Sequence, residues 1–298
     1  MKAIVFNNYD EKFDQLNKHL KIDKIDFEFI RFNNGEGKVV VKEDVENEDI
    51  IIFSDFNNTK IEKSKDECYV NLKRLISALD DARSISVFLP LIYQSRQNAN
   101  KKLESKDFLM FVNDLKNIGV KNILTFELHG DHDDVISYSL SKIFKNYNYD
   151  VVVSPDDGGV SRSKEYSKVL NCDNRHFSKV RDLNKLVNGS NPIKEYININ
   201  YDFKGKNVVI VDDILDSGST LINALNNIND ANKVDIFVAY PLFSSGVKKF
   251  KKMVKLNKLN KIYVSNLIYL DKKVLKNKFI EVIDVNEVIS ECIKEVIK

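Results

Sequence analysis

The stretch VVIVDDILDSGSTL, residues 208–221, indicates how the chain folds. Its apolar start is typical of a buried parallel strand. Two adjacent carboxylates, Asp212 and Asp213, follow, then a short loop of small polar residues, and a helical pattern begins at Leu221. The order of strand, small polar loop and helix predicts an α/β unit, with the loop at the carboxyl end of a parallel strand.

The loop Asp216-Ser217-Gly218-Ser219-Thr220 has the composition of a phosphate-binding site. Small side chains allow backbone N–H groups to face a phosphate, hydroxyls add donors, and the helix N-terminus is partly positive. Asp212 and Asp213 cannot bind phosphate, but two carboxylates suit the vicinal hydroxyls of a sugar or a magnesium ion. A ribose 5-phosphate group has both features. The alternative is an ordinary capped turn, since Asp and Ser commonly start helices; the density of specific features favours the phosphate site.

The composition excludes several classes of protein. The 298 residues allow roughly two domains, and 46 Lys and Arg against 44 Asp and Glu give a net charge of +2. No overall field therefore favours nucleic acid or an anionic membrane. The three cysteines are too far apart for a disulfide framework or a metal site. No stretch approaches the ~18 apolar residues of a membrane span, so we expect a soluble cytoplasmic protein.

Strand-like and helical patterns alternate along the whole chain, which predicts an α/β fold. The strand-like runs are Ala3–Phe6, Phe27–Phe32, Ile50–Phe53, Ile85–Leu89, Ile123–Phe126, Val151–Val153, Val208–Val211, Val234–Ala239, Ile262–Val264 and Phe279–Ile283. Amphipathic segments at 71–79 and 108–118 lie between some of them. A seam at 145–150 separates two similar series, so we expect domains at 1–147 and 148–298. The closing helix, 285–298, is expected to pack on the first domain.

Residues suited to polyphosphate or metal follow four of these runs, where parallel sheets bind ligands. They are Arg96-Gln97, Glu127-Leu128-His129, Asp156 within SPDDGGVSR, and Lys179 with Arg181. The last two lie in a polar stretch, Phe177–Pro192, typical of either a mobile loop that closes over a site or a surface hairpin. Taken singly, each cluster has an ordinary structural explanation.

Taken together, these motifs resemble those of ribose-phosphate pyrophosphokinases, in the same order and over essentially the whole chain. The segment Phe32-Asn33-Asn34-Gly35-Glu36 is similar to that family's adenine-contacting segment. The resemblance implies two similar type I phosphoribosyltransferase-like domains, each a mostly parallel sheet flanked by helices. The first would carry the ATP side and the oligomer contacts, and the second the ribose-phosphate loop.

The resemblance also implies an activity, the Mg²⁺-dependent transfer of the β,γ-diphosphate of ATP to the 1-hydroxyl of ribose 5-phosphate, giving phosphoribosyl pyrophosphate and AMP. Positioning and dispersal of charge are sufficient for such chemistry. The implied ribose-phosphate ligands are Asp212, Asp213, Asp216, Ser217, Gly218, Ser219 and Thr220; the implied ATP ligands are Phe32, Asn34, Glu36, Arg96, Gln97 and His129. The implied metal ligands are His129 and Asp156, and the implied catalytic residues are Lys179, Arg181 and His129. A homo-oligomer, dimer or hexamer, is expected, with the adenine segment reaching a neighbouring subunit.

The chain departs from the family pattern mainly in its first half. Glu127 and Asn98 stand where the family has Asp, and so does Asn34. The segment after His129 is shortened, and the stretch Ala239-Tyr240-Pro241-Leu242-Phe243-Ser244 stands where many members have His-Gly. These changes leave open a larger acceptor such as ADP-ribose, the substrate of an ADP-ribose pyrophosphate synthetase in phage NAD restoration. Two further alternatives are a non-catalytic regulatory homologue and a phosphoribosyltransferase.

Overall fold

The computed structural model describes residues 1–6, 9–57, 64–97, 103–181, 193–197 and 200–296, with the backbone alone at 179–181 and 193–197. It divides into two compact units. The first contains residues 1–138, 267–269 and the C-terminal segment from 285 onward, and the second contains 139–266 and 270–284. No helix among the described residues is long and apolar enough to cross a membrane.

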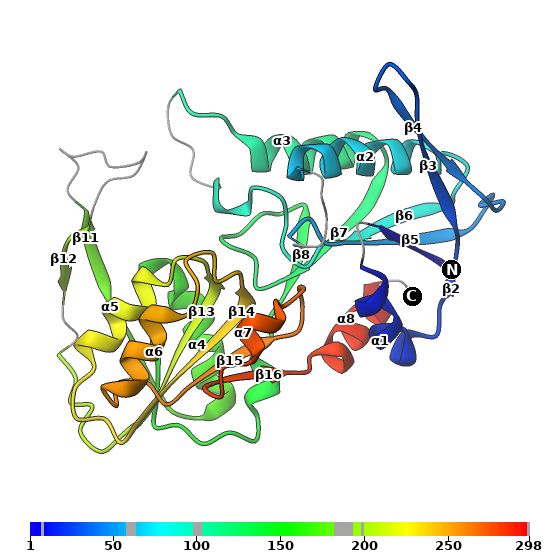
Figure 1. Cartoon of the computed structure of the whole chain (residues 1–298). Helices are drawn as coiled ribbons and strands as arrows, with labels where there is room; N and C mark the ends of the chain where they lie inside the picture. The colour runs from blue at the N-terminus through cyan, green and yellow to red at the C-terminus, as the bar shows by residue number, and fades with distance from the viewer. Residues whose placement is uncertain (7–8, 58–63, 98–102, 182–192, 198–199, 297–298) are drawn as a thin grey trace. The chain divides into compact units, whose positions relative to one another are not determined.

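The first unit is built on a parallel sheet with the strand order β2-β1-β5-β6-β7-β8 (Figure 1). Its strands are β1 (Lys2–Phe6), β2 (Asp23–Lys24), β5 (Asp49–Ser54), β6 (Ser84–Phe88), β7 (Val120–Phe126) and β8 (Val135–Tyr138). The central strands β5 and β6 are mostly buried runs of Ile, Val and Phe, as expected for strands covered on both faces.

The second unit repeats this topology, with the parallel order β10-β9-β13-β14-β15-β16. Its strands are β9 (Val151–Ser154), β10 (Asp173–His176), β13 (Asn207–Leu215), β14 (Lys233–Pro241), β15 (Lys261–Ser265) and β16 (Ile280–Ile283). The two sheets therefore confirm the predicted pair of similar α/β domains.

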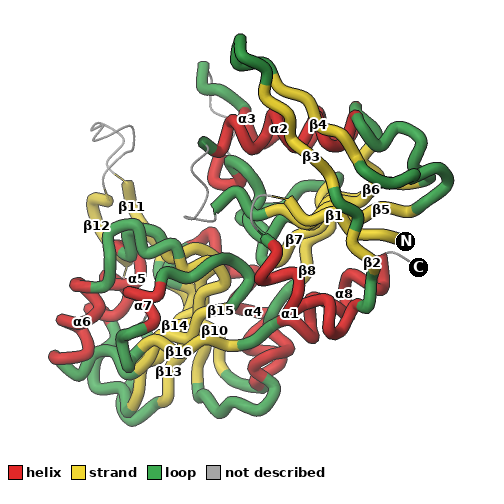
Figure 2. Tube along the Cα trace, turned by 45° about the vertical axis from the view of Figure 1, so that its right-hand side comes forward, coloured by secondary structure: helices red, strands yellow, loops and turns green. Residues whose placement is uncertain are grey.

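The direction of each crossover determines which face a helix covers, because βαβ crossovers are right-handed. In the second unit α5 (Ser219–Asn227), α6 (Lys248–Lys255) and α7 (Lys272–Leu275) join strands that step one way across the sheet and share one face (Figure 2). The crossover through α4 (Val160–Leu170) steps the other way, which places α4 on the opposite face.

The first unit follows the same rule. Helices α2 (Lys65–Ser77) and α3 (Asp107–Asn117) share one face, and α1 (Asp10–Leu20) lies on the other, where α8 (Asn286–Val296) packs against it. Three short 3-10 helices complete the helical elements: η1 (Ser95–Gln97), η2 (Ser141–Phe144) and η3 (Asp157–Gly159).

Each unit also has a two-stranded antiparallel hairpin outside its main sheet. The first consists of β3 (Phe27–Arg31) and β4 (Gly37–Val41), and the second of β11 (Ser178–Arg181) and β12 (Ile193–Ile197). The run Phe27–Phe32 thus contains a strand, β3, but it pairs with β4 in a hairpin and does not belong to the parallel sheet. Residues 178–181 form a hairpin strand, one of the two alternatives predicted there; 182–192 lie outside the described residues.

Side chains alternate between the two faces of β13 and β14. Val208, Ile210 and Ile236 belong to the apolar core that includes residues of α5 and α6. Phe237 instead contacts Tyr166 of α4, with ring centroids 5.6 Å apart, and Val211 pairs with Phe237 in the sheet. Val211 therefore faces α4, and Val208 and Ile210 face α5 and α6; this alternation ends before Leu215, which belongs to the same core as Val208.

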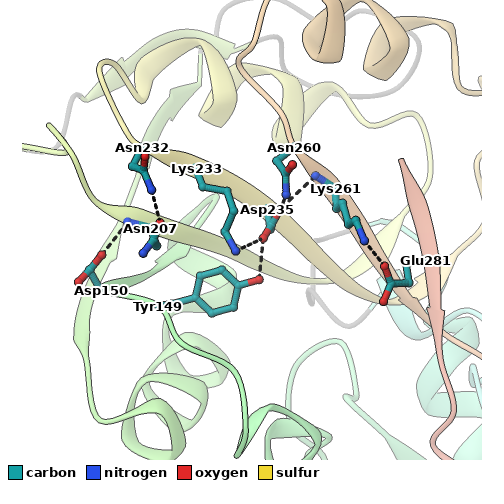
Figure 3. Close-up of polar contacts among 9 residues, drawn as sticks. All are labelled: Tyr149, Asp150, Asn207, Asn232, Lys233, Asp235, Asn260, Lys261 and Glu281. Atoms are coloured by element: carbon teal, nitrogen blue, oxygen red, sulfur yellow. Dashed lines mark hydrogen bonds and ion pairs between the residues drawn. The ribbon is translucent and has the colours of Figure 1, made fainter. Parts of the chain in front are cut away.

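A buried carboxylate joins the amino ends of the strands in the second sheet (Figure 3). Asp235 is fully buried; its Oδ2 accepts from the Tyr149 hydroxyl at 2.8 Å and lies 3.1 Å from Lys233 Nζ. Its Oδ1 accepts from Asn260 Nδ2 at 2.7 Å and from the Lys261 backbone N–H at 3.0 Å. Burial and Asp235 together raise the pKa of Tyr149, so its hydroxyl keeps the donated proton. The network is at the edge remote from the carboxyl ends, so we interpret it as structural.

The first unit contains a carboxyl group that should destabilise it as the pH rises. Asp55 is 1% exposed after β5, and burial raises its pKa to about 6, although backbone hydrogen bonds from Asn57 and Tyr269 oppose the shift. No described residue hydrogen-bonds its Oδ2. The pKa of Asp55 is higher in the folded than in the unfolded protein, so its contribution to the free energy of unfolding is greatest below about pH 4. This contribution falls by roughly 2–3 kcal/mol as the pH rises through 6.

We therefore expect Asp55→Asn to gain stability relative to the wild type between pH 4 and 7, measured by urea unfolding at each pH. Asp49→Asn is the matched control: hydrogen bonds from Arg83 and Ser84 lower the pKa of Asp49 to about 2, so it is ionised throughout that range. A pH-independent difference between Asp55→Asn and the wild type would contradict the assignment.

Candidate functional site

The order of the second sheet reverses between β9 and β13, and open α/β sheets bind ligands outside the carboxyl ends of strands at such a switch point. The turn after β9 contains Asp156, and the end of β13 contains Asp212 and Asp213. Asp156, Asp212, Asp213 and the small polar loop at 216–220 are therefore brought together at one edge of the sheet, and we call the region that they line the crevice. The predicted acceptor residues lie there on adjacent strands.

The turn after β9 is tightly built. The Ser154 hydroxyl donates to the Asp156 carbonyl at 2.6 Å, and a Cβ at Gly159 would lie 2.6 Å from the Ser154 hydroxyl oxygen. Only glycine allows η3 to follow this closely after the strand. Asp156 is half-buried with an extended backbone, whereas the exposed Asp157 accepts from the Ser178 hydroxyl at 2.6 Å. That bond joins the base of the β11–β12 hairpin to the turn.

The two adjacent aspartates at the end of β13 differ in environment. Asp213 is 4% exposed, and its Oδ2 accepts from Arg162 Nη2 at 3.0 Å. Asp212 is half-buried, and its Oδ1 accepts from the Asp213 backbone N–H at 3.0 Å. Burial, followed by the Asp213 charge and with a smaller contribution from Asp156, raises the pKa of Asp212 well above its usual value, and Arg162 opposes the shift. The crevice is thus rich in negative charge and suited to hydroxyl donors or a cation.

Residues that follow β14 contact the loop after β13 and support it. Gly218 has φ +74° and precedes α5, and a Cβ there would lie 2.6 and 2.7 Å from atoms of the Phe250 ring. The Phe243 backbone N–H donates to the Leu215 carbonyl at 2.9 Å, and the Ser244 hydroxyl donates to Asp216 Oδ1. The loop is therefore fixed in shape, with Ser217 and Ser219 exposed on its outer side.

This packing predicts that Gly218→Ala will both destabilise the protein and raise the KM for the acceptor. Left-handed backbone costs a non-glycine residue about 1 kcal/mol, and overlap with Phe250 adds roughly 1–3 kcal/mol. Gly205→Ala is the matched control, because Gly205 has φ +71° with nothing within 4 Å of its Cβ position. Thermal unfolding and steady-state kinetics of both variants test this; equal effects would show that Phe250 does not support the loop.

The residues predicted to close over the transferring group lie on the hairpin of the second unit. Lys179 and Arg181 are in β11, where Lys179 pairs with Tyr196 and Arg181 with Ile193 across an irregularity at 180/181. The described backbone places them on an element anchored to the turn of Asp156 through Ser178.

The predicted ATP residues belong to the first unit. Arg96 and Gln97 are exposed in η1, which follows β6, while Asn98 lies outside the described residues. His129 is half-buried in the short segment between β7 and β8. Glu127, two residues earlier, is 6% exposed with φ +45°, and Gly130 has φ +83°. Positive φ at a buried non-glycine residue is costly and often marks a functional loop.

The segment predicted to contact adenine is the tip of the β3–β4 hairpin. The backbone N–H of Phe32 donates to the Glu36 carbonyl at 2.8 Å, and Asn34 Nδ2 donates to Glu36 Oε2 at 2.9 Å. The Phe32 ring is 47% exposed, and Lys38 Nζ lies 5.8 Å from its centroid. The tip thus presents an aromatic ring to solvent from an ordered turn.

No group of three His, Cys, Asp or Glu side chains among the described residues forms a ready-made metal site. The half-buried Asp156 nevertheless supplies carboxylate oxygens of the kind that Mg²⁺ takes singly, together with waters and substrate phosphates. The residues present therefore fit a magnesium ion bound together with a polyphosphate.

Comparison with known proteins agrees with this geometry. Residues 1–119 match the family model described as the N-terminal domain of ribose phosphate pyrophosphokinase, and residues 128–261 match the phosphoribosyl transferase domain. The chain belongs to the ribose-phosphate pyrophosphokinase family. One relative, the ribose-phosphate pyrophosphokinase of Vibrio cholerae, is 25% identical over 323 positions, covering 99% of this chain and 96% of that protein. The Shewanella oneidensis enzyme of the same name is 26% identical over 293 positions, covering 89% and 86%.

The fold of this pyrophosphokinase family member matches a solved structure over its whole length. The crystal structure of phosphoribosylpyrophosphate synthetase from Mycobacterium smegmatis aligns with a TM-score of 0.78 at 22% identity, covering 99% of this chain and 98% of that one. The family's two-domain architecture is therefore present, despite the low sequence identity.

Sequence reasoning did not identify two residues that contact the predicted ribose-phosphate residues of this pyrophosphokinase family member. Arg162 pairs with Asp213, and Ser244 bonds Asp216 from a segment 28 residues further along the chain. The alternation of β13 would have indicated that Asp213 faces α4. Nothing in the local sequence around Ser244 indicates its contact with Asp216.

Proposed function

We propose that this protein transfers the β,γ-diphosphoryl group of ATP to the 1-hydroxyl of ribose 5-phosphate, giving phosphoribosyl pyrophosphate and AMP. The observation that carries the proposal is that Asp156, Asp212 and the loop 216–220 come together at the switch point of the second sheet, a set of groups that suits a ribose and its phosphate. The name of the relatives supports it. In this assignment the first unit binds ATP and the second binds the acceptor.

On the acceptor side, backbone N–H groups of the loop and the hydroxyls of Ser217, Ser219 and Thr220 bind the 5-phosphate. Asp212, near the end of β13, accepts hydrogen bonds from the ribose hydroxyls. The 1-hydroxyl oxygen attacks the β-phosphorus of ATP, the bond from that phosphorus to the α-phosphate oxygen breaks, and AMP leaves with the electron pair. The hydroxyl proton passes to solvent.

On the donor side, Arg96 and Gln97 bind the ATP phosphates, and Lys179 and Arg181 neutralise charge on the transferring group. Mg²⁺, bound with His129 and Asp156, would supply further neutralisation of the phosphates. After burial, the charges of Asp213 and Asp156 raise the pKa of Asp212, and a bound cation would offset these charges.

The test is incubation of the protein with ATP, Mg²⁺ and one acceptor at a time, followed by separation of the nucleotides. AMP that forms only when ribose 5-phosphate and Mg²⁺ are both present supports the proposal. Ligand binding without turnover would instead support a non-catalytic regulatory homologue. Release of pyrophosphate from phosphoribosyl pyrophosphate and a base would support a phosphoribosyltransferase.

ADP-ribose is the second candidate acceptor, because its terminal ribose and adjoining phosphate have the same groups as ribose 5-phosphate. Ser217 and Ser219 are exposed, so the described residues leave room for a group attached to the bound phosphate. The enzyme would then act in NAD metabolism. AMP formation with ADP-ribose at a higher kcat/KM than with ribose 5-phosphate would establish it.

We also propose that the protein forms a homo-oligomer, a dimer or a hexamer, in the cytoplasm. The exposed Phe32 at the hairpin tip is expected to reach the ATP site of a neighbouring subunit. Light scattering should therefore give a mass above that of a monomer, and Phe32→Ala should raise the KM for ATP and leave the KM for the acceptor unchanged. An active monomer would remove Phe32 and Glu36 from the site.

A further inference from the structure

Arg162 is a buried cation that the proposed chemistry does not use. Its side chain is 10% exposed on the first turn of α4, and it pairs with the 5% exposed side chain of Asp213. A guanidinium is buried this deeply only when it is paired and hydrogen-bonded, because desolvation costs several kcal/mol. General packing therefore does not explain why a buried arginine lies beside the acceptor crevice.

The alternation of β13 separates the two aspartates of the crevice. Asp213 is at an odd position and faces α4, where Arg162 donates to its Oδ2 at 3.0 Å, and its Oδ1 accepts from the Ile214 backbone N–H at 2.7 Å. Asp212 is at an even position and faces the side of α5, the helix that begins at the phosphate loop. Both carboxylate oxygens of Asp213 are thus engaged by the protein.

We propose that Arg162 and Asp213 form a positioning pair that holds Asp212 for the ribose hydroxyls of the acceptor, so that Asp212 contacts the ribose and Asp213 does not. This inference rests on the proposed function. The pair acts in two ways. It fixes the Asp213 backbone N–H that donates to Asp212 Oδ1 at 3.0 Å, and the Arg162 charge offsets the carboxylates of Asp212 and Asp213.

The turn after β9 brings Arg162 to this position. Gly159 lies against Ser154, and a Cβ at Gly159 would be 3.6 Å from Arg162 Nη1. Helix α4 therefore begins close to the strand end and packs beside β13, which Arg162 contacts through Asp213. This explains why the arginine stands three residues after the glycine, where its side chain meets Asp213.

The test compares steady-state kinetics of Arg162→Gln, Asp213→Asn and the double variant with ATP and ribose 5-phosphate. We expect each variant to raise the KM for ribose 5-phosphate about 10- to 100-fold, with the KM for ATP within about twofold of wild type. The double variant should resemble either single variant, because the two residues act as one unit. Arg162→Lys, which keeps the charge, should recover most of the loss.

Two results would overturn the pair. An Asp213→Asn effect far larger than that of Arg162→Gln, with additive loss in the double variant, would show that Asp213 itself contacts the ribose. Lower thermal stability with an unchanged KM for ribose 5-phosphate would show a purely structural role. If Arg162→Gln fails to fold, the double variant decides, because it leaves no unpaired buried charge: a raised KM supports the pair and a wild-type KM overturns it.

Asp235→Asn is the matched control, a buried carboxylate in the same sheet at the opposite edge. It should lower thermal stability and leave the KM for ribose 5-phosphate unchanged. The wild-type reaction separates the two proposals: no AMP from ribose 5-phosphate contradicts the proposed function, whereas normal wild-type turnover with unaltered variants contradicts the positioning pair alone.

Discussion

Lys179→Ala is expected to lower kcat about a thousandfold or more while the protein remains folded. Phosphoryl transfer depends on cations placed where negative charge accumulates, and removing one such cation costs several kcal/mol of transition-state stabilisation. Lys179 lies on β11, whose first residue is bonded to the turn of Asp156, so the hairpin is anchored beside the acceptor crevice. Single-turnover measurement of AMP gives the rate of the chemical step directly.

Lys251→Ala provides the control for Lys179→Ala. Lys251 is exposed on α6, the helix whose buried residues include Phe250 and Met253, and it has no part in the proposed chemistry. Its loss should leave kcat within about twofold of wild type, as for an ordinary surface substitution. If Lys179→Ala were as active as Lys251→Ala, Lys179 would have no role in the transfer.

Asp235→Ala is expected to cost about 3–5 kcal/mol of the free energy of unfolding, the second large effect. The substitution leaves the buried Tyr149 hydroxyl, the Asn260 amide and the Lys261 backbone N–H without their acceptor, and it removes the partner of Lys233. Unpaired buried polar groups cost about 1–3 kcal/mol each, and breaking a buried ion pair is similarly costly. Urea unfolding measures the change.

Asp150→Ala tests whether this loss follows from burial. Asp150 lies at the same edge but is exposed, and its Oδ2 accepts one bond, from the Asn207 backbone N–H at 2.7 Å (Figure 3). Loss of a single solvent-accessible hydrogen bond costs about 1 kcal/mol. If Asp150→Ala and Asp235→Ala lowered the free energy of unfolding equally, the burial of Asp235 would not explain the loss.

Local patterns predicted the core strands of both sheets well, because strands such as Ile50–Phe53 and Val234–Ala239 are apolar runs with few alternatives. Some edge and hairpin strands were not predicted, although the edge strand β16 was, as the run Phe279–Ile283. Strand β10 (Asp173–His176) is polar, and β4 (Gly37–Val41) is half-buried, so neither stands out from a loop by composition. Their pairing depends on contacts with residues distant in the sequence, which periodicity does not report.

For the site, the sequence predicted the crevice residues that follow strands, because parallel strands bring their carboxyl ends to one edge. Asp156 and Asp212 are examples. It did not predict the supporting contacts of Arg162 and Ser244, which depend on how a helix and a loop pack beneath the crevice. The division of roles between Asp212 and Asp213 likewise required the observed faces of β13.

The central claim is that the crevice of the second unit accepts a diphosphate from ATP on the 1-hydroxyl of ribose 5-phosphate. The most direct measurement is ³¹P nuclear magnetic resonance of the protein with ATP, Mg²⁺ and ribose 5-phosphate. We predict equal amounts of AMP and a new diphosphate attached to C1 of the ribose. Formation of ADP and free phosphate, or no loss of ATP in the presence of ribose 5-phosphate, would contradict it.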